Sequence, residues 1–429
     1  MKKSRKHLCA ENFIKTIHNC FSKIKDPSNR TGKISLTNCL MSCFAIFSLK
    51  YPSLLSFEIE KKLPKAISNL KKLYLIEHPP SDTYMRERLD VLDPKTLRPA
   101  FKKVFSSIQR GKDLESYQYI DNHYLISIDG TGHYSSEKVH CKNCCIKNHK
   151  SGKKTYYHQM LGAVMVHPDK KEVIPFCPEP IQKKDGNKKN DCERNASKRL
   201  LEDLKREHPH LKIMIVEDGL AANAPHIRLL ENLSMKYIIG VKPKDHEYLF
   251  DWFKNLEKNE YEFIDKKRTK HKFNFANELP LNYQNDNLKV NFLEYWETDS
   301  KGKSKHFTWI TNVKITINNV FKIMKGGRSR WRVENETFNT LKNQGYNFEY
   351  NFGHGKENLC SVMGLLLMLA FLIDQAQLLC CRLFQQVKRA CRTFYNIWNN
   401  MLAVFKYFFV DSWEHFFKNI IRVYIPDTS

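Results

Sequence analysis

The sequence has little glycine and proline, with 16 of each among 429 residues. Few positions are therefore reserved for turns and linkers, and a largely disordered chain is excluded. Hydrophobic residues make up 41% of the sequence, which lets a chain of this length bury a sizeable core. We expect a globular protein of two or three domains.

Long hydrophobic runs are also absent. The most apolar stretch, Val362–Ile373, falls short of the roughly 18 residues that suggest a membrane span, and Asp374 ends it. The basic start, Met1–His7, is followed by a segment that carries charges where a secretory signal has an unbroken apolar run. The sequence thus predicts a buried helix over Val362–Ile373, with no export signal and no membrane partner.

The cysteines lack the pattern of a disulfide framework. There are 13 of them, an odd number, and they are scattered along the chain. Scattered, unpaired cysteines in a chain of this size are typical of a reducing compartment. We therefore expect a cytoplasmic protein.

Acidic residues are scarce relative to basic ones. The chain has 46 Asp and Glu against 71 Lys and Arg, a formal charge of +25. Solubility alone needs only a few net charges. An excess of this size causes repulsion between charges within the protein unless a polyanion neutralises it. The composition therefore predicts a polyanionic partner, with nucleic acid as the first candidate.

Helical periodicity dominates the first part of the chain, for example in Leu36–Leu49 and Leu97–Ile108. We interpret residues 1–118 as a helical N-terminal, DNA-binding domain. From Tyr124 onwards short apolar runs predict a mixed sheet with two amphipathic helices. The expected strands are Tyr124–Asp129, Tyr156–Val166, Glu172–Phe176, Lys212–Glu217 and Lys236–Val241, and the expected helices are Arg194–Glu207 and Ala224–Leu233.

These elements divide the rest of the chain into an α/β core interrupted once. The first part of the core covers residues 119–242 and includes a loop rich in cysteine and histidine at 133–155. Residues 243–306 are polar, contain short candidate strands such as Val290–Trp296, and predict a β-rich insertion. The strand His306–Thr311 returns to the core, whose second part covers 307–384 and in which Gly326-Gly327 predicts a break between two helices. Residues 385–429 form a helical tail.

Two aspartates follow apolar strands directly. Asp129 ends Leu-Ile-Ser-Ile and precedes Gly130, and Asp218 ends Lys-Ile-Met-Ile-Val-Glu and precedes Gly219. If the two strands are adjacent and parallel, both carboxylates lie at the same edge of the sheet. Cleavage of a phosphodiester benefits from two hard cations about 3.5–4 Å apart, and carboxylates are their natural ligands.

Glu334 is the best candidate for a third acid. A helix that places Glu334 on its inner face also places Trp331 and Phe338 there, so these two aromatic residues are expected to anchor it. Arg330 and Lys342 flank the acid along the same helix, where DNA phosphates would lie. The alternative is a solvated surface helix with ordinary ion pairs, and only the combination with the two aspartates favours a site.

These three blocks resemble the catalytic blocks of bacterial insertion-sequence transposases, which have an RNase H-like core. The resemblance covers about residues 80–375 and rests on Ser-Ile-Asp-Gly-Thr at Ser127–Thr131, Val-Glu-Asp-Gly-Leu at Val216–Leu220 and the segment Arg330–Tyr346. The segment Ser81–Asp90 also belongs to it. The long gap before the glutamate matches the subgroup with a β-strand insertion between the second Asp and the Glu. The resemblance implies Asp129, Asp218 and Glu334 as catalytic residues that bind two Mg²⁺ ions, which Mn²⁺ can replace.

The same subgroup carries a Tyr, Arg, Glu, Lys signature around the glutamate. Arg330 and Glu334 match it, whereas Gly327 stands at the Tyr position and Leu341 at the Lys position, with Lys342 next to it. A second register remains open, in which Glu336 is the acid and Arg332 takes the place of the arginine. We prefer Glu334, because Trp331 then keeps its spacing to the acid.

The segment 133–155 also predicts a candidate zinc site. Cys141 and Cys144 form a C-x₂-C pair, and tetrahedral Zn²⁺ needs four such ligands. The remaining ligands would come from His140, Cys145 or His149, with Cys177 and Cys192 as distant alternatives. Since no second C-x₂-C exists, a reduced, metal-free hairpin rich in cysteine is an equal alternative.

Several further residues are candidates for contact with DNA. Trp309 is a candidate for stacking on an unpaired base, although a core position is the commoner role for such a residue. The lysine-rich segment around 133–155 is a candidate DNA-facing arm. The remaining candidates are Arg330, Arg332 and Lys342 near the third acid, and Lys183 and Lys184 in a polar loop.

The sequence therefore predicts a DNA transposase that cuts at the ends of a mobile element and joins them to target DNA. The expected partners are double-stranded DNA and a second copy of the chain in a synaptic complex, and the resemblance places the protein on the bacterial nucleoid. Two alternatives remain. One is a catalytically silent, transposase-derived DNA-binding protein, and the other is a nuclease of the same fold that does not join strands.

Overall fold

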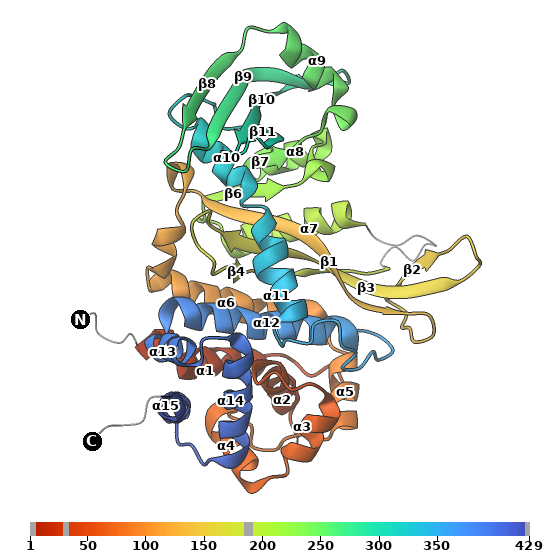
Figure 1. Ribbon diagram of the computed structural model, residues 1–429. Helices are drawn as coiled ribbons and strands as arrows, with labels where there is room; N and C mark the ends of the chain where they lie inside the picture. The colour runs from red at the N-terminus through yellow and green to blue at the C-terminus, as the bar shows by residue number, and fades with distance from the viewer. Residues whose placement is uncertain (1–5, 29–33, 184–191, 425–429) are drawn as a thin grey trace.

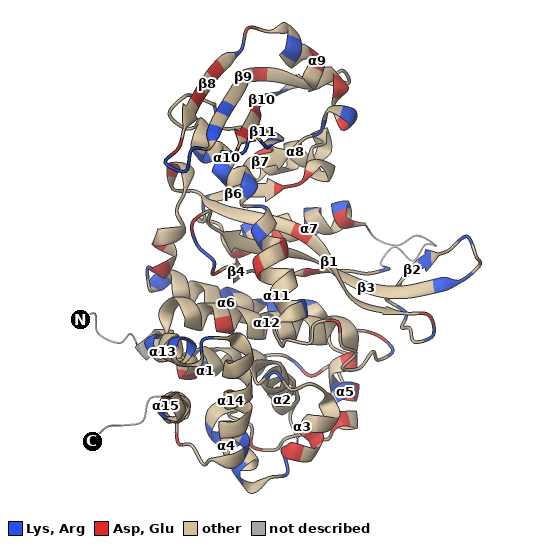
Figure 2. Ribbon diagram, viewed as in Figure 1, with Lys and Arg blue, Asp and Glu red and all other residues tan. Residues whose placement is uncertain are grey.

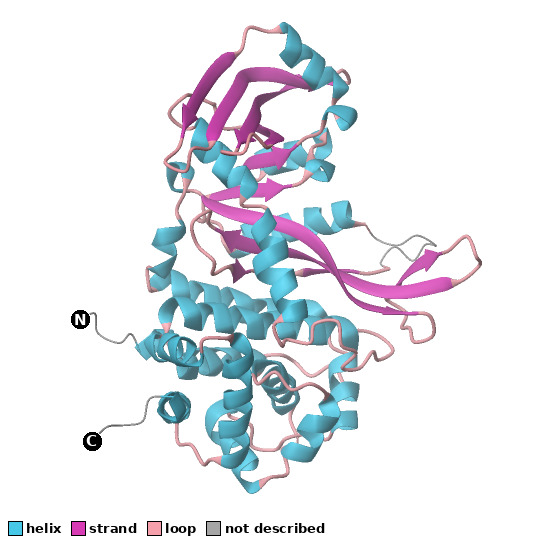
Figure 3. Cartoon of the chain, viewed as in Figure 1, coloured by secondary structure: helices cyan, strands magenta, loops and turns pink. Residues whose placement is uncertain are grey.

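The computed structural model describes residues 6–28, 34–183 and 192–424. These residues form a large mixed sheet that lies beside a body of helices (Figure 1). Figure 3 shows the division: strands occupy the middle and one end of the molecule, and the opposite end is helical. Helices α1 and α15, near the two ends of the described chain, lie at the helical end (Figure 1). The protein is thus of mixed α/β class, as the sequence predicts.

The helical body combines the two ends of the chain. Helix α12 packs against α2, α5 and α6, and α14 packs against α4, so the predicted helical tail lies on the predicted N-terminal domain. The N-terminal helices are α1 (Ala10–Phe21), α2 (Leu36–Ser48), α3 (Leu54–Glu60), α4 (Pro64–Tyr74), α5 (Asp82–Asp90) and α6 (Arg98–Arg110). The C-terminal helices are α12 (Leu359–Cys380), α13 (Arg382–Cys391), α14 (Phe394–Tyr407) and α15 (Trp413–Tyr424).

Helix α12 contains the expected buried helix over Val362–Ile373. It is long and apolar enough to cross a membrane by length and composition, but its most apolar window is wholly buried within the fold, as in a core helix. The helix continues past Asp374, where the sequence predicted that it would end. The Asp374 carboxylate accepts hydrogen bonds from Lys50 Nζ (2.7 Å) and Tyr346 Oη (2.8 Å). A buried charge that is paired in this way is compatible with a continuing helix.

The sheet runs in the order β2-β3-β1-β6-β7-β11-β10-β9-β8, with the short strands β4 and β5 also paired to β3. The pairs β1–β6 and β6–β7 are parallel, and the other pairs are antiparallel. The core strands are β1 (Tyr124–Ser136), β2 (Cys145–Asn148), β3 (Lys154–Val166), β4 (Ile174–Pro175), β5 (Glu179–Ile181), β6 (Ile213–Glu217) and β7 (Lys236–Gly240). Each predicted core strand is therefore present within about two residues of its predicted ends, except that β1 runs on past the predicted end at Asp129.

The predicted β-rich insertion extends this same sheet. It contains α9 (Glu247–Asn255), β8 (Asn259–Ile264), β9 (Lys270–Asn282) and β10 (Asn285–Thr298), followed by β11 (Ser304–Thr311). Strand β11 pairs antiparallel with β7, which makes the strands of the insertion continuous with those of the core. The insertion is thus an extension of the sheet at one edge.

The segment 133–155, predicted as a loop, is mostly a continuation of the sheet. Strand β1 runs on to Ser136, paired with Tyr156 of β3, and β2 pairs with the start of β3. Strands β2 and β3 project beyond the rest of the molecule (Figure 1). We call residues 133–155 the hairpin arm.

Helices cover the core strands from both sides. Helix α7 (Glu193–Glu207) packs on β3 and β5, and α8 (Ala224–Asn232) packs on β7. Helix α10 (Val320–Arg328) packs on β6, β7 and β10, and the π-helical turn η7 (Val333–Phe338) packs on β1 and β3 before α11 (Asn339–Asn343). The predicted break at Gly326-Gly327 is wrong, because both glycines lie inside α10.

Candidate active site

Asp129 and Asp218 lie at the same edge of the sheet. Strands β1 and β6 are adjacent and parallel, with Ser127 paired to Val216, so each aspartate stands two residues beyond a matched pair. Adjacent strands are about 4.8 Å apart. Asp218 Oδ1 also accepts a hydrogen bond from Leu220 N (3.0 Å), which fixes the turn after β6.

Asp129 is held between one positive group and several negative ones. Its Oδ2 lies 3.5 Å from Arg330 Nη1, and its Oδ1 accepts a hydrogen bond from Gly130 N (2.8 Å). Burial nevertheless raises the pKa of Asp129, and the charges of Asp218 and Glu334 raise it further against the opposing effect of Arg330. The three predicted acids therefore act on one another electrostatically.

Glu334 is brought to this edge by η7. Ser127 Oγ donates a hydrogen bond to the carbonyl of Arg330 (2.9 Å), and Phe338 lies against Gly162. Gly162 is the partner of Asp129 across β1 and β3, so Phe338 seats the turn directly beside that aspartate. Phe338 thus anchors the segment, as expected.

Trp331 does not anchor the segment and is 56% exposed. Residues 333–338 adopt π-helical pitch, which inserts an extra residue into a turn and rotates later side chains relative to earlier ones. Val333, Phe338 and Leu341 consequently form the buried face. The expected common face of Trp331 and Phe338 is therefore wrong.

Glu336, the alternative acid, faces another direction. It lies 3.6 Å from Arg332 Nη1, and Arg332 Nη2 donates to the carbonyl of Pro168 (2.6 Å). Both residues line a separate surface cavity with Trp331 and Phe321. Of the two glutamates, Glu334 is the one whose charge acts on Asp129.

A fourth carboxylate, that of Glu193, stands at the site and was missed by sequence reasoning. A Cβ placed on Gly130 would lie 2.5 Å from Glu193 Oε1. Burial raises the pKa of Glu193, and the charges of Asp129 and Asp218 add to the effect. The only sequence signal is an acid in the first turn of a helix, which is too common to single it out.

The acids open onto a cleft of about 900 Å³ between α7 and α8. Asp129, Glu193 and Asp218 lie on its wall. Three basic residues, Arg194, Lys198 and Arg228, also line it and are exposed. The cleft thus combines hard oxygen ligands with cations that suit a polyanion.

Trp309 is not available for stacking on a base. It is 6% exposed and packs beside Phe307, with a ring-centroid separation of 5.7 Å. A Cβ on Gly327 would lie 2.5 Å from Trp309 Nε1. The Trp309 indole therefore fills the space beside α10 that a larger side chain at position 327 would occupy. This accounts for the glycine at position 327, the Tyr position of the signature.

Two of the other predicted DNA contacts, Arg332 and Lys342, pair with acids of the chain. Lys342 Nζ lies 2.9 Å from Glu349 Oε1, and the backbone of Lys183 donates to the carbonyl of Asn143 (3.3 Å). Lys184 lies outside the described residues. Arg330 is thus the predicted contact that faces the acids directly.

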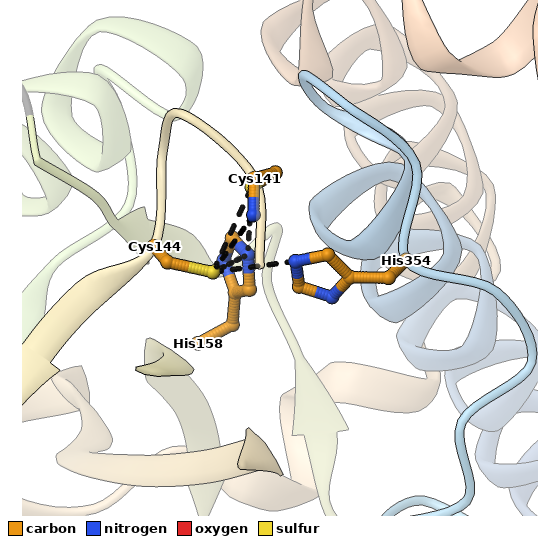
Figure 4. A group of neighbouring side chains, drawn as sticks. All are labelled: Cys141, Cys144, His158 and His354. Atoms are coloured by element: carbon orange, nitrogen blue, oxygen red, sulfur yellow. Dashed lines mark hydrogen bonds between the residues drawn. The ribbon is translucent and has the colours of Figure 1, made fainter. Parts of the chain in front are cut away.

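Cys141 and Cys144 are brought together with two histidines from elsewhere in the chain. Their ligand atoms and those of His158 and His354 all lie within 4.8 Å of one another, and all four residues are buried. His158 is on β3, and His354 lies between α11 and α12 (Figure 4). Sequence reasoning missed both histidines. For His158 the only signal was a polar residue in an apolar strand, and His354 lies in a loop.

The other predicted zinc ligands lie outside this cluster. His140 stacks on Tyr156, and His149 bonds to Thr155 Oγ1 (2.8 Å) at the far end of the hairpin arm. The thiol of Cys145 is directed to the carbonyl of Ile181 (3.7 Å). Cys177 and Cys192, the distant alternatives, also lie outside the cluster.

Comparisons with known proteins give little at the level of sequence. No family model matches the chain, and no curated protein matches it. Among solved structures, the chain is similar to the piggyBac transposase in its synaptic complex with hairpin DNA, with a TM-score of 0.43 and 12% identity over 99% of this chain and 85% of that chain. A similarity with so low a TM-score carries no argument about the site, whose interpretation rests on its own geometry.

Proposed function

We propose that this protein is a DNA transposase of the Asp-Asp-Glu kind. The observation that carries the proposal is the parallel register of β1 and β6, which sets Asp129 and Asp218 side by side. Glu334 reaches the same edge from η7, close enough for its charge to act on Asp129. Three carboxylates from separate parts of the sequence thus lie near one another, and Asp129 and Asp218 line the cleft.

The strand order supports an RNase H-like core. The antiparallel strands β5, β3 and β1 are followed by β6 and β7, which are parallel to β1. The first acid lies on the middle strand β1, the second at the end of its parallel neighbour, and the third on a helical segment across one face. This is the arrangement that the resemblance of the three sequence blocks implies.

The acids fit divalent cations by their chemistry. Asp129, Asp218 and Glu334 offer only oxygen ligands, which Mg²⁺ and Mn²⁺ prefer. Burial first, and then the charges of Asp218 and Glu334, raise the pKa of Asp129, and a bound cation would offset these effects. When bound, two such ions activate the attacking oxygen of a phosphodiester reaction and stabilise the leaving oxygen.

The chain's own cations would position the DNA. Arg330 lies next to Asp129 and would hold the phosphate at which the reaction takes place. Arg194, Lys198 and Arg228 would bind the backbone along the cleft. The hairpin arm would add contacts further out, since Figure 2 shows basic residues on β2 and the start of β3. Its exposed lysines are Lys138, Lys142, Lys147, Lys150, Lys153 and Lys154.

The proposal extends to the partners and the location of the protein. The substrates are double-stranded transposon ends and target DNA, bound by two copies of the chain in a synaptic complex. The place of action is the nucleoid in the bacterial cytoplasm. The formal charge of +25 supports a nucleic-acid partner.

A strand-transfer assay tests the proposal. The protein is incubated with Mg²⁺, a linear DNA that carries the sequences flanking its own reading frame, and a supercoiled target plasmid. We expect cleavage at defined flanking positions and products in which the freed 3′ ends are joined to the plasmid. Cleavage without joined products would identify a nuclease, and DNA binding without cleavage would identify a silent DNA-binding protein. Either result would overturn the proposal.

A further inference from the structure

A second cluster of metal-binding residues lies away from the carboxylates, at the base of the hairpin arm. Cys141 and Cys144 lie in the turn between β1 and β2, His158 on β3, and His354 in the segment before α12. Figure 4 shows the side chains pointing toward a common centre. We infer that Cys141, Cys144, His158 and His354 together bind one Zn²⁺ ion, which fastens the hairpin arm to the segment before α12.

The distances match a tetrahedral zinc site. Ligand bonds of about 2.3 Å to sulfur and 2.0–2.1 Å to nitrogen place two sulfurs roughly 3.8 Å apart and a sulfur and a nitrogen roughly 3.5 Å apart. The two Sγ atoms are 3.8 Å apart. His158 Nε2 lies 3.3 Å from Cys141 Sγ and 3.4 Å from Cys144 Sγ, and His354 Nε2 lies 3.2 Å from Cys144 Sγ.

The chemistry of the four ligands also favours zinc. Two thiolates and two imidazoles in a tetrahedral array suit Zn²⁺ and do not suit Mg²⁺ or Ca²⁺. The sulfurs are too far apart for a disulfide, whose S–S bond is about 2.05 Å.

The turn that carries the cysteines is shaped for this role. The backbone amide of Cys141 donates to Cys144 Sγ (3.4 Å), and the amide of Cys144 donates to the carbonyl of Cys141 (3.3 Å). All four ligands are less than 9% exposed. Four protein ligands in a closed site leave no position for a substrate, which indicates a structural ion.

The ion would add to contacts that already join the two segments. Lys142 pairs with Glu357 (2.7 Å), and Asn143 Nδ2 donates to the carbonyl of Glu357 (2.9 Å) and to Asn358 Oδ1 (3.0 Å). The ring of Tyr134 also packs on that of His354, with centroids 4.2 Å apart. Zinc ligands from both segments would strengthen this attachment between the arm and the segment before α12.

Metal analysis of the intact protein tests the inference. Untagged protein is produced in zinc-supplemented medium, purified without chelator, and analysed for metals by inductively coupled plasma mass spectrometry. We expect about one Zn²⁺ per chain in the wild type and most of it lost in Cys144→Ser and His354→Ala. Cys145→Ser is the matched control, because it removes the adjacent thiol that faces Ile181, and it should retain the zinc.

Two further measurements keep the result decisive. If the ligand variants fail to fold, replacement of zinc by Co²⁺ in the wild type should give the absorption bands of tetrahedral Co²⁺ with thiolate ligands. The double variant Asp129→Asn, Asp218→Asn should keep its zinc, which separates this site from the carboxylates. Wild-type protein that is stably folded without zinc, or zinc that is lost with the aspartates and kept in Cys144→Ser, would overturn the inference.

Discussion

Glu193 lies against Gly130, so close that a Cβ at position 130 would stand 2.5 Å from its Oε1. Gly130 follows Asp129 directly, and the pKa of Glu193 rises first through burial and then through the charges of Asp129 and Asp218. The absence of a side chain at Gly130 thus allows a fourth carboxylate to enter the site. The proposed metal site has a fourth potential ligand on α7.

The first prediction concerns this carboxylate. Glu193→Gln is expected to lower metal-dependent DNA cleavage about 10- to 100-fold, because an amide is a poorer ligand for hard cations. Gly130→Ala should have a similar effect by displacing Glu193. Glu202→Gln, an exposed position on the same helix, is the control and should cleave normally. Full activity of Glu193→Gln at limiting Mg²⁺ would remove this residue from the site.

The second prediction concerns stability in the absence of metal. Burial is the first cause that raises the pKa of Asp129 in the folded state. The protonated carboxyl therefore stabilises the folded protein below the unfolded pKa of about 4, and this stabilisation is lost as the pH rises through the folded pKa. The Asp129→Asn variant has no carboxyl to ionise at this position, so it does not lose this stability as the pH rises. We expect the variant to be more stable than the wild type by about 0.5–1 kcal/mol at pH 7, given partial solvent screening, and equally stable near pH 3.

Thermal unfolding with chelator present measures this difference across pH. Saturating Mg²⁺ should make the wild type more stable than Asp129→Asn at pH 7, because only the wild type gains stability from the bound ions. A wild type that is more stable than Asp129→Asn without metal at neutral pH would show that Arg330 outweighs the burial of the carboxylate.

The third prediction separates two basic residues on the segment that carries Glu334. Arg330 faces Asp129, whereas Lys342 already pairs with Glu349. Arg330→Ala should reduce the slope of log affinity for DNA against log salt by about one unit, the value for one lost phosphate contact. Lys342→Ala should reduce it less. Equal slopes for Arg330→Ala and the wild type would show that Arg330 does not contact DNA.

The strands and helices of the core could be predicted because local patterns determine them. The apolar runs ending at Asp129 and Asp218 became β1 and β6, and the amphipathic segment Arg194–Glu207 became α7 (Glu193–Glu207). Their parallel pairing was a condition for the site and is present in the structure. The position of Asp218 therefore followed from its strand end. Asp129 was expected at a strand end but lies inside β1, which runs on to Ser136 in pairing with β3.

What could not be predicted depends on packing between distant segments. Trp331 was expected to face inward because regular α-helical spacing was assumed, and the π-helical turn changes that spacing. His158 and His354 are far apart in the sequence and meet only when β3 packs beside the segment before α12. Trp309 is buried because Gly327 leaves room for its ring, a relation that periodicity cannot reveal.

The central claim is that Asp129, Asp218 and Glu334 form the metal site of a DNA-cleaving enzyme. The most direct test is the rate of Mg²⁺-dependent cleavage of the flanking DNA by Glu334→Gln and Glu336→Gln, two matched variants on the same turn. We predict a loss of at least about 100-fold for Glu334→Gln, with DNA binding retained, and a change of less than about threefold for Glu336→Gln, whose side chain pairs with Arg332. An active Glu334→Gln protein, or an inactive Glu336→Gln protein that is folded and binds DNA, would contradict the account.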